Sequence, residues 1–370
     1  MHWPIDGNPD ECEGQLLQSK AGSGMIPHNR PTLGDPEKGA SVRVLDSGWV
    51  AQGCEVQAFE AEVCSYLGLD ERCAVAFSSG TAALFMALRV LGARGKRVAI
   101  PVYSCAALRN AVVMAAAKPV ALDVEPDSPN IDLDALPPAG IDLIIAAHMF
   151  GFPSRWPREY NSIPVIEDCA QALGARIDGI PVGVNGTASV FSFYATKMLT
   201  SGGQGGMLVS REKSLIDAAR DYRQFDSRHD RTPRFNLQMT DLQAAVGRAQ
   251  LAQLGTFIDR RKEIQRQYSA AGIPLWPRPK AAHEPNHYRA IVEHSDPPAA
   301  IEQLERDGVR AIVPIHDWEL IDDAEKFPRA AALCRRTISL PTYPLLTSAE
   351  VATIIRAVAK LVPTCKSRQQ

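Results

Sequence analysis

DLIIAAHMFG (142–151) and IPVIED (163–168) decide the fold class, because each is a short and almost continuously apolar run. Strands of this composition are buried on both faces, as in a mostly parallel sheet. Helical patterns such as ALRNAVVMAAA (107–117) lie between several such runs, which is typical of βαβ crossovers. The sequence therefore predicts an α/β fold whose central sheet spans residues 75–210. The other runs assigned to it are RVAIP (97–101), KPVALDV (118–124), ASVFSF (188–193) and GGMLVS (205–210).

The rest of the chain predicts a second, smaller domain. Apolar residues recur at helical spacing over 239–272, where Gly255 is a point at which a long helix can break. A Pro-rich segment (273–285) follows, and beyond it strand and helix patterns alternate. We expect a large domain with its N-terminal segment over 26–260 and a small α/β domain over 261–370. Residues 1–25 lack a hydrophobic period and are expected to form a flexible leader.

Composition argues against several classes of function. The 370 residues carry 40 Lys and Arg against 42 Asp and Glu, so there is no cationic excess to hold nucleic acid. No run approaches the roughly 20 apolar residues that span a bilayer, and the first residues lack the pattern of a signal peptide. The eight cysteines form no CxxC pair and no HExxH is present. We expect a cytoplasmic protein without a metal site.

SSGTAAL (78–84) is the first candidate binding element. Ser78, Ser79, Gly80 and Thr81 lie where a strand is expected to turn into a helix. Free N–H groups and the positive end of the helix dipole bind phosphate at such a point. The alternative is that the hydroxyl side chains only cap the helix.

A carboxylate, an amine and a glycine cluster follow along the sheet. Asp168 ends a buried strand, where an α/β sheet binds its ligands, although a strand-end Asp can also be a turn residue. Lys197 follows an aromatic strand, and the glycines at 202, 203, 205 and 206 let the backbone approach closely. Taken singly, Lys197 can be a surface charge and the cluster a flexible turn. Together, a phosphate cradle, an anion for a pyridine nitrogen and a Schiff-base lysine are what pyridoxal 5′-phosphate requires.

The motifs in this order resemble the DegT/DnrJ/StrS family of pyridoxal phosphate sugar aminotransferases. The resemblance covers 26–362 and is carried by IPHNRPTLG, SGWVAQG, SSGTAALFMAL, PVYSCAALRNAV, HMFGFP, IEDCAQALGA, VFSFYATKMLTSGGQGG and FNLQMTDLQAAVGRAQL. It implies a fold type I aminotransferase that works as a homodimer. Its implied substrates are a keto sugar, usually linked to a nucleotide, and glutamate as amino donor.

The resemblance also implies roles for individual residues. Lys197 takes the place of the Schiff-base lysine and Asp168 that of the partner of the pyridine nitrogen. Gln171 matches a residue near the ring hydroxyl, and Asn236 matches an asparagine that reaches the phosphate from the neighbouring subunit. The phosphate ligands are matched by Gly80, Thr81 and Ser192.

Departures from the family pattern fall around the substrate. Where many relatives place an aromatic that stacks on the pyridine ring, the chain offers either Cys105 or Tyr103. The glycine run after the lysine has one extra residue and Gln204 in place of an acid, and Gln238 stands where the family often has Arg.

Three other candidates and two rival functions complete the analysis. His148 can contact substrate or be a core histidine, Arg228 and Arg231 can grip a diphosphate or be solvated, and Trp49 can stack on a ligand or fill a gap.

One rival function is a sugar dehydratase with the same cofactor, but its known members in the family replace the lysine by histidine. The other is a non-catalytic regulatory protein of the same fold, which retention of the cofactor residues argues against.

Overall fold

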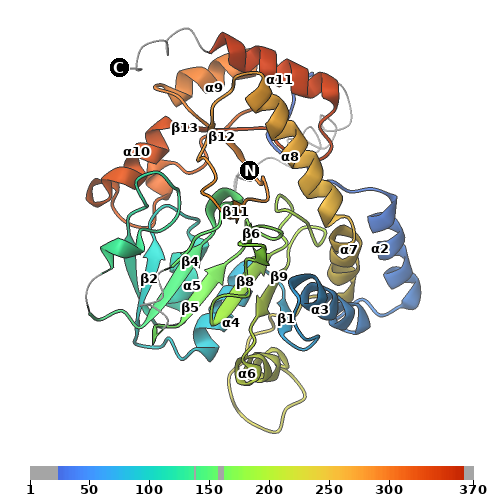
Figure 1. The fold of residues 1–370 in the computed structure, drawn as a ribbon. Coiled ribbons are helices and arrows are strands. Elements are labelled where there is room, and N and C mark those ends of the chain that lie inside the picture. The colour runs from blue at the N-terminus through green and yellow to red at the C-terminus, as the bar shows by residue number, and fades with distance from the viewer. Residues whose placement is uncertain (1–23, 137–138, 157–161, 362–370) are drawn as a thin grey trace, which may run out of the picture.

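The computed structural model describes residues 24–136, 139–156 and 162–361. Its centre is a seven-stranded sheet with the order β1-β9-β8-β5-β4-β2-β3 (Figure 1). All neighbours pair in parallel except β9, which is antiparallel to both β1 and β8. The prediction of an α/β fold with a mostly parallel sheet is confirmed. The strands are β1 (Ala74–Phe77), β2 (Arg97–Pro101), β3 (Lys118–Leu122), β4 (Leu143–Ala147), β5 (Val165–Asp168), β8 (Ala188–Ser192) and β9 (Gly206–Val209).

Helices cover both faces of this sheet, so its strands are buried on two sides. The alternation is plain in β1, where Val75 and Phe77 pack on one face and Ala74 and Ala76 on the other. The first face carries α4 (Gly80–Val90), α5 (Ala107–Met114) and α6 (Lys213–Arg223); the second carries α3 (Cys54–Leu67), with α7 (Asp241–Leu251) and α2 (Asp35–Ser47) packed outside it. Two-sided burial explains why the strands read as apolar runs without alternation.

The segment 239–272, predicted as a long helix that can break at Gly255, is two helices, α7 and α8 (Leu254–Ala270). The break lies at residues 252–253, just before Gly255, which is inside α8. Gln253 turns its side-chain amide back to the Ala249 carbonyl and to Glu37 of α2, and these hydrogen bonds hold the corner. α8 then runs without interruption from the large sheet toward the C-terminal part (Figure 1).

The C-terminal part is built on a second sheet, of order β10-β12-β13, which is antiparallel. Its own core includes Ile264 and Tyr268 of α8 and Ile338 of β13. The N-terminal segment joins this part, because Ile26 is buried and bridges to Val309. The elements are β10 (Leu275–Trp276), β12 (Ala290–Glu293), β13 (Thr337–Leu340), α9 (Pro297–Arg306), α10 (Pro328–Arg336), α11 (Ser348–Lys360) and the 3-10 turns η4 (Asp317–Glu319) and η5 (Ala324–Lys326).

Some elements were not predicted. Strands β6 (Arg176–Ile177), β7 (Ile180–Pro181) and β11 (His283–Glu284) form a third small sheet, and the turns η1 (Leu133–Ala135) and η2 (Met149–Gly151) follow β3 and β4. The Pro-rich segment 273–285 thus supplies one strand to each small sheet. Most of the expected leader, residues 1–23, lies outside the described residues.

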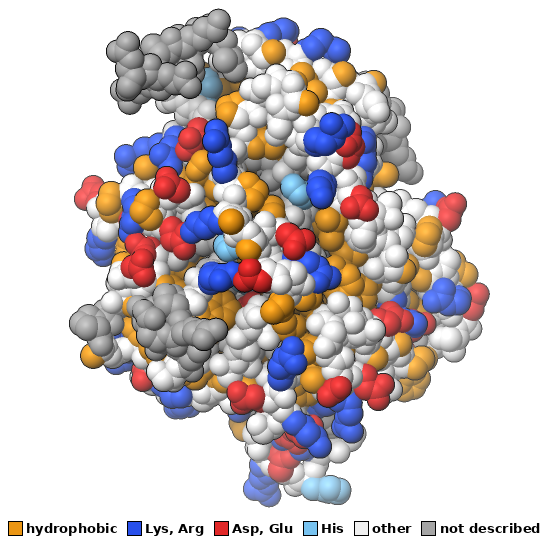
Figure 2. Space-filling view, viewed as in Figure 1, with side chains coloured by type: hydrophobic (Ala, Val, Ile, Leu, Met, Phe, Trp, Pro, Cys, Tyr) orange, Lys and Arg blue, Asp and Glu red, His pale blue; other side chains and the backbone are white. Residues whose placement is uncertain are grey.

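The surface seen in Figure 2 shows hydrophobic side chains along the middle of the molecule, between the C-terminal part above and the large sheet below. Lys, Arg, Asp and Glu are scattered around them rather than gathered by sign. None of the described helices is long and apolar enough to cross a membrane.

Candidate active site

A cavity of about 770 Å³ lies where the carboxyl ends of the parallel strands meet the C-terminal part. The large domain lines it with the start of α4, the loop after β2 and the ends of β4, β5 and β8. Tyr288, Arg289 and the segment around η4 line it from the C-terminal side. The strand ends of an α/β sheet are where its ligands bind.

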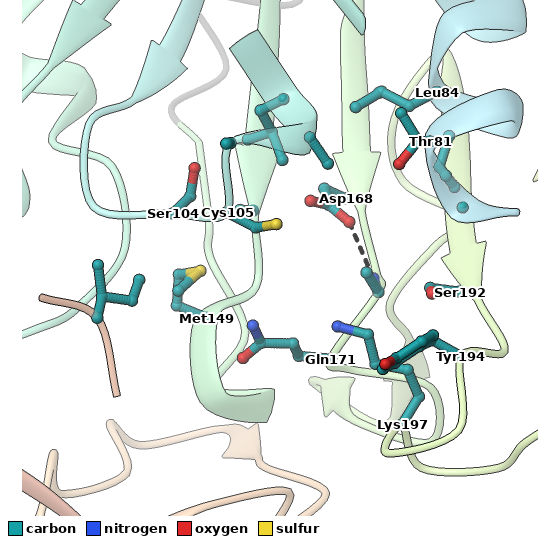
Figure 3. A pocket seen from close by; sticks show the side chains of 18 of the residues that line it. Thr81, Leu84, Ser104, Cys105, Met149, Asp168, Gln171, Ser192, Tyr194 and Lys197 are labelled. Atoms are coloured by element: carbon teal, nitrogen blue, oxygen red, sulfur yellow. Dashed lines mark hydrogen bonds between the residues drawn. The ribbon is translucent and has the colours of Figure 1, made fainter. Parts of the chain in front are cut away.

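The start of α4 lines the cavity with Gly80 and Thr81, and Ser192 at the end of β8 lines it next to Gly80; Thr81 and Ser192 are labelled in Figure 3. Ser79 caps the helix, because its Oγ accepts a hydrogen bond from Ala82 N–H at 3.1 Å. The capping alternative therefore holds for Ser79, while Gly80 and Thr81 open the helix with N–H groups that precede its first internal hydrogen bonds. These N–H groups and the hydroxyls of Thr81 and Ser192 make a cradle suited to a phosphate.

Close backbone approach shapes this cradle, as the glycine cluster predicts. A Cβ on Gly80 would lie 2.9 Å from Ser192 Cβ. A Cβ on Gly206, in β9, would lie 2.5 Å from Gly80 N and closer still to the Ser79 carbonyl. The helix start can rest against β9 only because both positions lack a side chain.

We expect Gly206→Ala to lower both the melting temperature and the affinity for the cofactor. The methyl group would meet backbone rather than a flexible side chain, so the start of α4 must shift, at a cost of about 1–3 kcal/mol. Thermal unfolding and a cofactor titration measure the two effects. Gly255→Ala is the matched control, because a Cβ there meets nothing within 4 Å. Wild-type values in both measurements for Gly206→Ala would contradict the close approach.

Asp168 ends β5 and lines the same cavity as the helix start. It is 9 % exposed, and its Oδ1 accepts a hydrogen bond from Ala170 N–H at 2.9 Å, drawn as a dashed line in Figure 3. Burial raises the pKa of Asp168 above its ordinary value, although this hydrogen bond and the Lys197 cation act in the opposite direction. A buried carboxylate of this kind is poised to pair with a cation, such as a protonated ring nitrogen.

His148 and Glu167 form a buried hydrogen-bonded pair at the end of β5. Glu167 is fully buried and accepts hydrogen bonds from His148 Nε2 and from the N–H groups of Gly183, Asn185 and Gly186 at 2.6–3.1 Å. Burial alone would raise the pKa of Glu167, but these hydrogen bonds bring it below the ordinary value. His148 Nδ1 accepts from Ser154 N–H, so its proton is on Nε2. His148 lines the cavity but is buried, and both of its ring nitrogens have hydrogen-bond partners within the protein.

Lys197 stands on a loop that folds back on itself. Phe193 N–H donates to the Gly205 carbonyl and Ala195 N–H to the Gly203 carbonyl, while Lys197 N–H donates to the Tyr194 carbonyl. Gly202 and Gly203 have φ of +76° and +139°, which other residues rarely adopt. This fold of the chain presents the Lys197 side chain to the cavity, between Gln171 and Tyr194 (Figure 3).

Gln171 is oriented by the backbone of a neighbouring loop. Its Oε1 accepts a hydrogen bond from Phe150 N–H at 2.8 Å, so its amide nitrogen is the group left to donate. Phe150 and Gly151 both have positive φ, and Gly151 is pressed against Asn286. Asn286 in turn donates to the Gln171 carbonyl at 2.9 Å. The C-terminal part therefore helps to set the position of Gln171.

The choice between Cys105 and Tyr103 is decided by burial. Tyr103 is fully buried, packs edge-on against Phe150 and does not line the cavity. Cys105 lines the cavity, and its sulfur points toward Asp168 (Figure 3). Cys105 is therefore the side chain available to a ring held between Asp168 and Lys197.

Other predicted residues lie outside the cavity of their own chain. Asn236 is exposed, and its Oδ1 accepts from Gln238 N–H. Arg228 pairs with Asp221 and Asp230, and Arg231 is exposed on the same loop. Trp49 is 61 % exposed, lies in the loop before α3 and donates to the Gln52 carbonyl. Gln204, by contrast, lines the cavity.

The sequence analysis missed the cavity residues of the C-terminal part. Tyr288 and Arg289 precede β12, and Trp318, 66 % exposed, lies in η4. In the sequence they belong to a strand pattern and a polar turn that carry no motif. Arg109 of α5, also missed, lines the cavity from the sheet side.

The residues present fit pyridoxal phosphate. Gly80 has no room for a side chain against Ser192, which leaves the cradle at the helix start formed by N–H and hydroxyl donors. A buried carboxylate, an amine and an amide donor line the same cavity at Asp168, Lys197 and Gln171. This donor set matches the phosphate, the pyridine nitrogen, the carbonyl and the ring hydroxyl of that cofactor. The ligand atoms of His148, Glu167 and Cys169 lie within 4.8 Å of one another, but both oxygens of Glu167 already accept N–H hydrogen bonds.

Comparison with known proteins agrees with this geometry. The chain is 32% identical to dTDP-4-dehydro-2,3,6-trideoxy-D-glucose 4-aminotransferase of Saccharopolyspora spinosa, over 91% of this chain and 97% of the relative. The crystal structure of the aminotransferase TlmJ from Streptoalloteichus hindustanus matches with a TM-score of 0.82 at 28% identity, over 90% and 98% of the two chains. DesV from S. venezuelae matches with a TM-score of 0.80 at 27% identity, over 95% and 96%. The model of one family matches residues 31–359. The chain belongs to the DegT/DnrJ/EryC1/StrS aminotransferase family.

Proposed function

We propose that this protein transfers an amino group from glutamate to the ketone of a nucleotide-linked sugar. That it is a sugar aminotransferase dependent on pyridoxal phosphate follows from its family and its relatives. The observation that carries the proposal is the meeting of Lys197, Asp168 and the start of α4 in one cavity. The nucleotide and the donor are inferences from the family resemblance and from the name of the S. spinosa relative.

The side chains have separate tasks in this reaction. When bound, pyridoxal phosphate supplies an electron sink that stabilises negative charge on the carbon next to the nitrogen. Gly80, Thr81 and Ser192 would hold its phosphate, and Asp168 would accept a hydrogen bond from its protonated ring nitrogen. Lys197 would hold it covalently and, once released, would take a proton from the α-carbon of the donor.

A screen of keto sugar nucleotides tests the proposal. The protein is loaded with pyridoxamine phosphate, and each sugar is added in turn while the absorbance of the aldehyde form is followed. A good substrate returns the cofactor to that form and yields an amino sugar detectable by mass spectrometry. Response to simple keto acids alone, with none to any sugar nucleotide, would contradict the sugar assignment.

We also propose a homodimer in which Asn236 completes the active site of the other subunit. Asn236 is exposed and does not line the cavity of its own chain, and its segment is held in place because the Leu237 carbonyl accepts a hydrogen bond from Ser78 N–H at 2.8 Å. The loop before it is tied to α6 by Arg234, which bridges Asp221 and Asp230 at 2.9 and 2.6 Å. A rigid, exposed asparagine is suited to reach a neighbouring molecule.

Mixing two inactive variants tests the shared site. Lys197→Ala and an inactivating Asn236 variant should regain activity when their subunits exchange, because a hybrid dimer then has one site with both defects and one with neither. Activity is measured before and after exchange, with each variant alone as control. A monomer in solution, or a mixture that stays inactive although hybrids form, would refute the shared site.

Two further assignments complete the proposal. We infer that residues 26–260 and 261–370 act as two domains joined through α8, which passes through this boundary as a single helix. We also assign the protein to the cytoplasm, where nucleotide-linked sugars are made.

A further inference from the structure

The peptide unit that precedes Lys197 is held at both ends. Its N–H, which belongs to Lys197, donates to the Tyr194 carbonyl at 2.9 Å. Its carbonyl, which belongs to Thr196, accepts a hydrogen bond from the side-chain amide of Asn29 at 3.0 Å. Among the described residues, this carbonyl accepts from no backbone N–H. Because a peptide unit is planar, the two hydrogen bonds together fix its orientation, and with it the point from which the Lys197 side chain leaves the backbone.

Asn29 belongs to the N-terminal segment (26–32) and lies 167 residues away in sequence from the carbonyl that it binds. This segment is anchored on both sides of Asn29. Before it, Ile26 exchanges backbone hydrogen bonds of 2.8 and 2.9 Å with residues 308 and 310 of the C-terminal part. After it, the Thr32 carbonyl accepts from Gln250 Nε2 of α7 at 2.6 Å. The Asn29 amide is therefore presented to the Lys197 loop from a fixed point of the fold.

The N-terminal segment also packs closely on this loop. A space of about 10 Å³ remains between them, lined by Asn29 and Thr32 on one side and by Ala195 and Lys197 on the other. This is room for a single water molecule at most. A side chain that fills the place of Asn29 without a donor would therefore leave the Thr196 carbonyl unpaired.

Tyr288 of the C-terminal part contacts the same stretch of the loop. Its ring centroid lies 5.9 Å from Lys197 Nζ. Burial alone would raise the pKa of Tyr288, but the nearby cations, Lys197 first among them, and a hydrogen bond with the Thr196 side chain bring it below the ordinary value. Thr196 is thus bound through its carbonyl by the N-terminal segment and through its side chain by the C-terminal part.

We propose that Asn29 is a positioning residue that fixes the direction of the Lys197 amine by binding the Thr196 carbonyl. This inference rests on the proposed role of Lys197, because Asn29 does not line the large cavity and would act only through the loop. Proton transfer by an amine requires a precise position of that amine, whereas binding of the donor does not. Loss of the Asn29 amide should therefore lower the rate of the reaction more than it lowers the affinity for the donor.

Asn29→Leu tests the proposal, because it keeps a side chain of similar size and removes the hydrogen-bond donor. In the apoprotein, we expect amide hydrogen exchange in the peptide 194–203 to become roughly tenfold faster, as for a buried acceptor left unpaired. In the cofactor-loaded protein, the half-reaction with glutamate should slow by about tenfold, with little change in the glutamate concentration that gives half the maximal rate. Asn29→Gln keeps an amide donor and should recover part of both losses.

Tyr268→Phe is the matched control. It also removes one hydrogen bond from a side chain to a distant carbonyl, that of Pro341 at 2.7 Å, but it lies in the core of the C-terminal part and does not line the cavity. It should lower the melting temperature without changing exchange in the peptide 194–203 or the rate with glutamate. If Asn29→Leu does not fold, Asn29→Ala is measured in the same way.

Two results would overturn the role of Asn29. One is unchanged exchange in the peptide 194–203 of the Asn29 variant. The other is a variant that, like Tyr268→Phe, loses only thermal stability and keeps the wild-type rate. Failure of borohydride to trap the cofactor on Lys197 of the wild-type protein is a different outcome, which would refute the proposed function, while the exchange measurement would still report on the Asn29 hydrogen bond.

Discussion

We expect Lys197→Ala to abolish the covalent link to the cofactor and to lower the transamination rate by roughly 10³-fold or more, while the protein stays folded. Lys197 is the only lysine among the described residues that line the cavity. Methyl replacement removes both the covalent anchor and the base that moves the proton. The purified variant should lack the yellow colour of the wild type. Reduction with borohydride followed by peptide mapping measures the link, and a half-reaction with glutamate measures the rate.

The control for this experiment is Lys118→Ala. Lys118 begins β3 at the edge of the sheet and is exposed, so its loss should change neither colour nor rate. The melting temperatures of both apoproteins should stay near that of the wild type, because Lys197 makes no ion pair with the described residues. Borohydride labelling of another lysine in the wild-type protein would refute the assignment.

Asp168→Asn should leave the cofactor bound but lower turnover by roughly 10²–10³-fold. An amide can still accept the hydrogen bond from Ala170 N–H, so the loop after β5 keeps its anchor. A neutral side chain cannot stabilise a positive charge on the ring nitrogen, and the electron sink weakens. Steady-state rates with a saturating donor, together with a cofactor titration, measure the two effects.

The same variant gives an independent result in the apoprotein. Burial raises the pKa of Asp168, so ionisation of this carboxyl opposes folding at neutral pH. This cost is present above the folded-state pKa and disappears as the pH falls below the ordinary value for Asp. The apoprotein of Asp168→Asn should therefore melt at the wild-type temperature or higher at pH 7, and the difference should vanish in acid. In the rate measurement, turnover of Asp168→Asn near that of the wild type would show that Asp168 is only a strand-end residue.

Surface carboxylates serve as the comparison for Asp168. Asp178 is exposed and pairs with Arg155 at 2.5 Å, so Asp178→Asn should change stability by less than about 1 kcal/mol and leave turnover unaltered. The contrast between the two Asp→Asn variants isolates the effect of a carboxylate inside the cavity from that of a charge change alone.

The active site was partly predictable because several of its parts are local. The start of α4, the end of β5 and the glycine cluster after β8 each lie within a few residues of a strand, and each strand is apolar enough to be recognised. Chain order and motif spacing then identified Gly80, Asp168 and Lys197 as candidates. Gly206 shows the limit, because its contact is with the backbone of Ser79, far away in sequence.

The sequence by itself determined the fold class and the main sheet, since burial on both faces imprints a continuous apolar pattern on the central strands. It also determined the family and the cofactor, through motifs that stay contiguous in the chain. Only the tertiary structure decided that Cys105 and not Tyr103 faces the cavity, that His148 is hydrogen-bonded to Glu167, and that Lys197 and Arg289 both lie within 6 Å of the centre of the Tyr288 ring. These facts depend on which loops meet across the cavity. Strand order and the packing of the C-terminal part determine which loops meet there. Neither leaves a local pattern in the sequence.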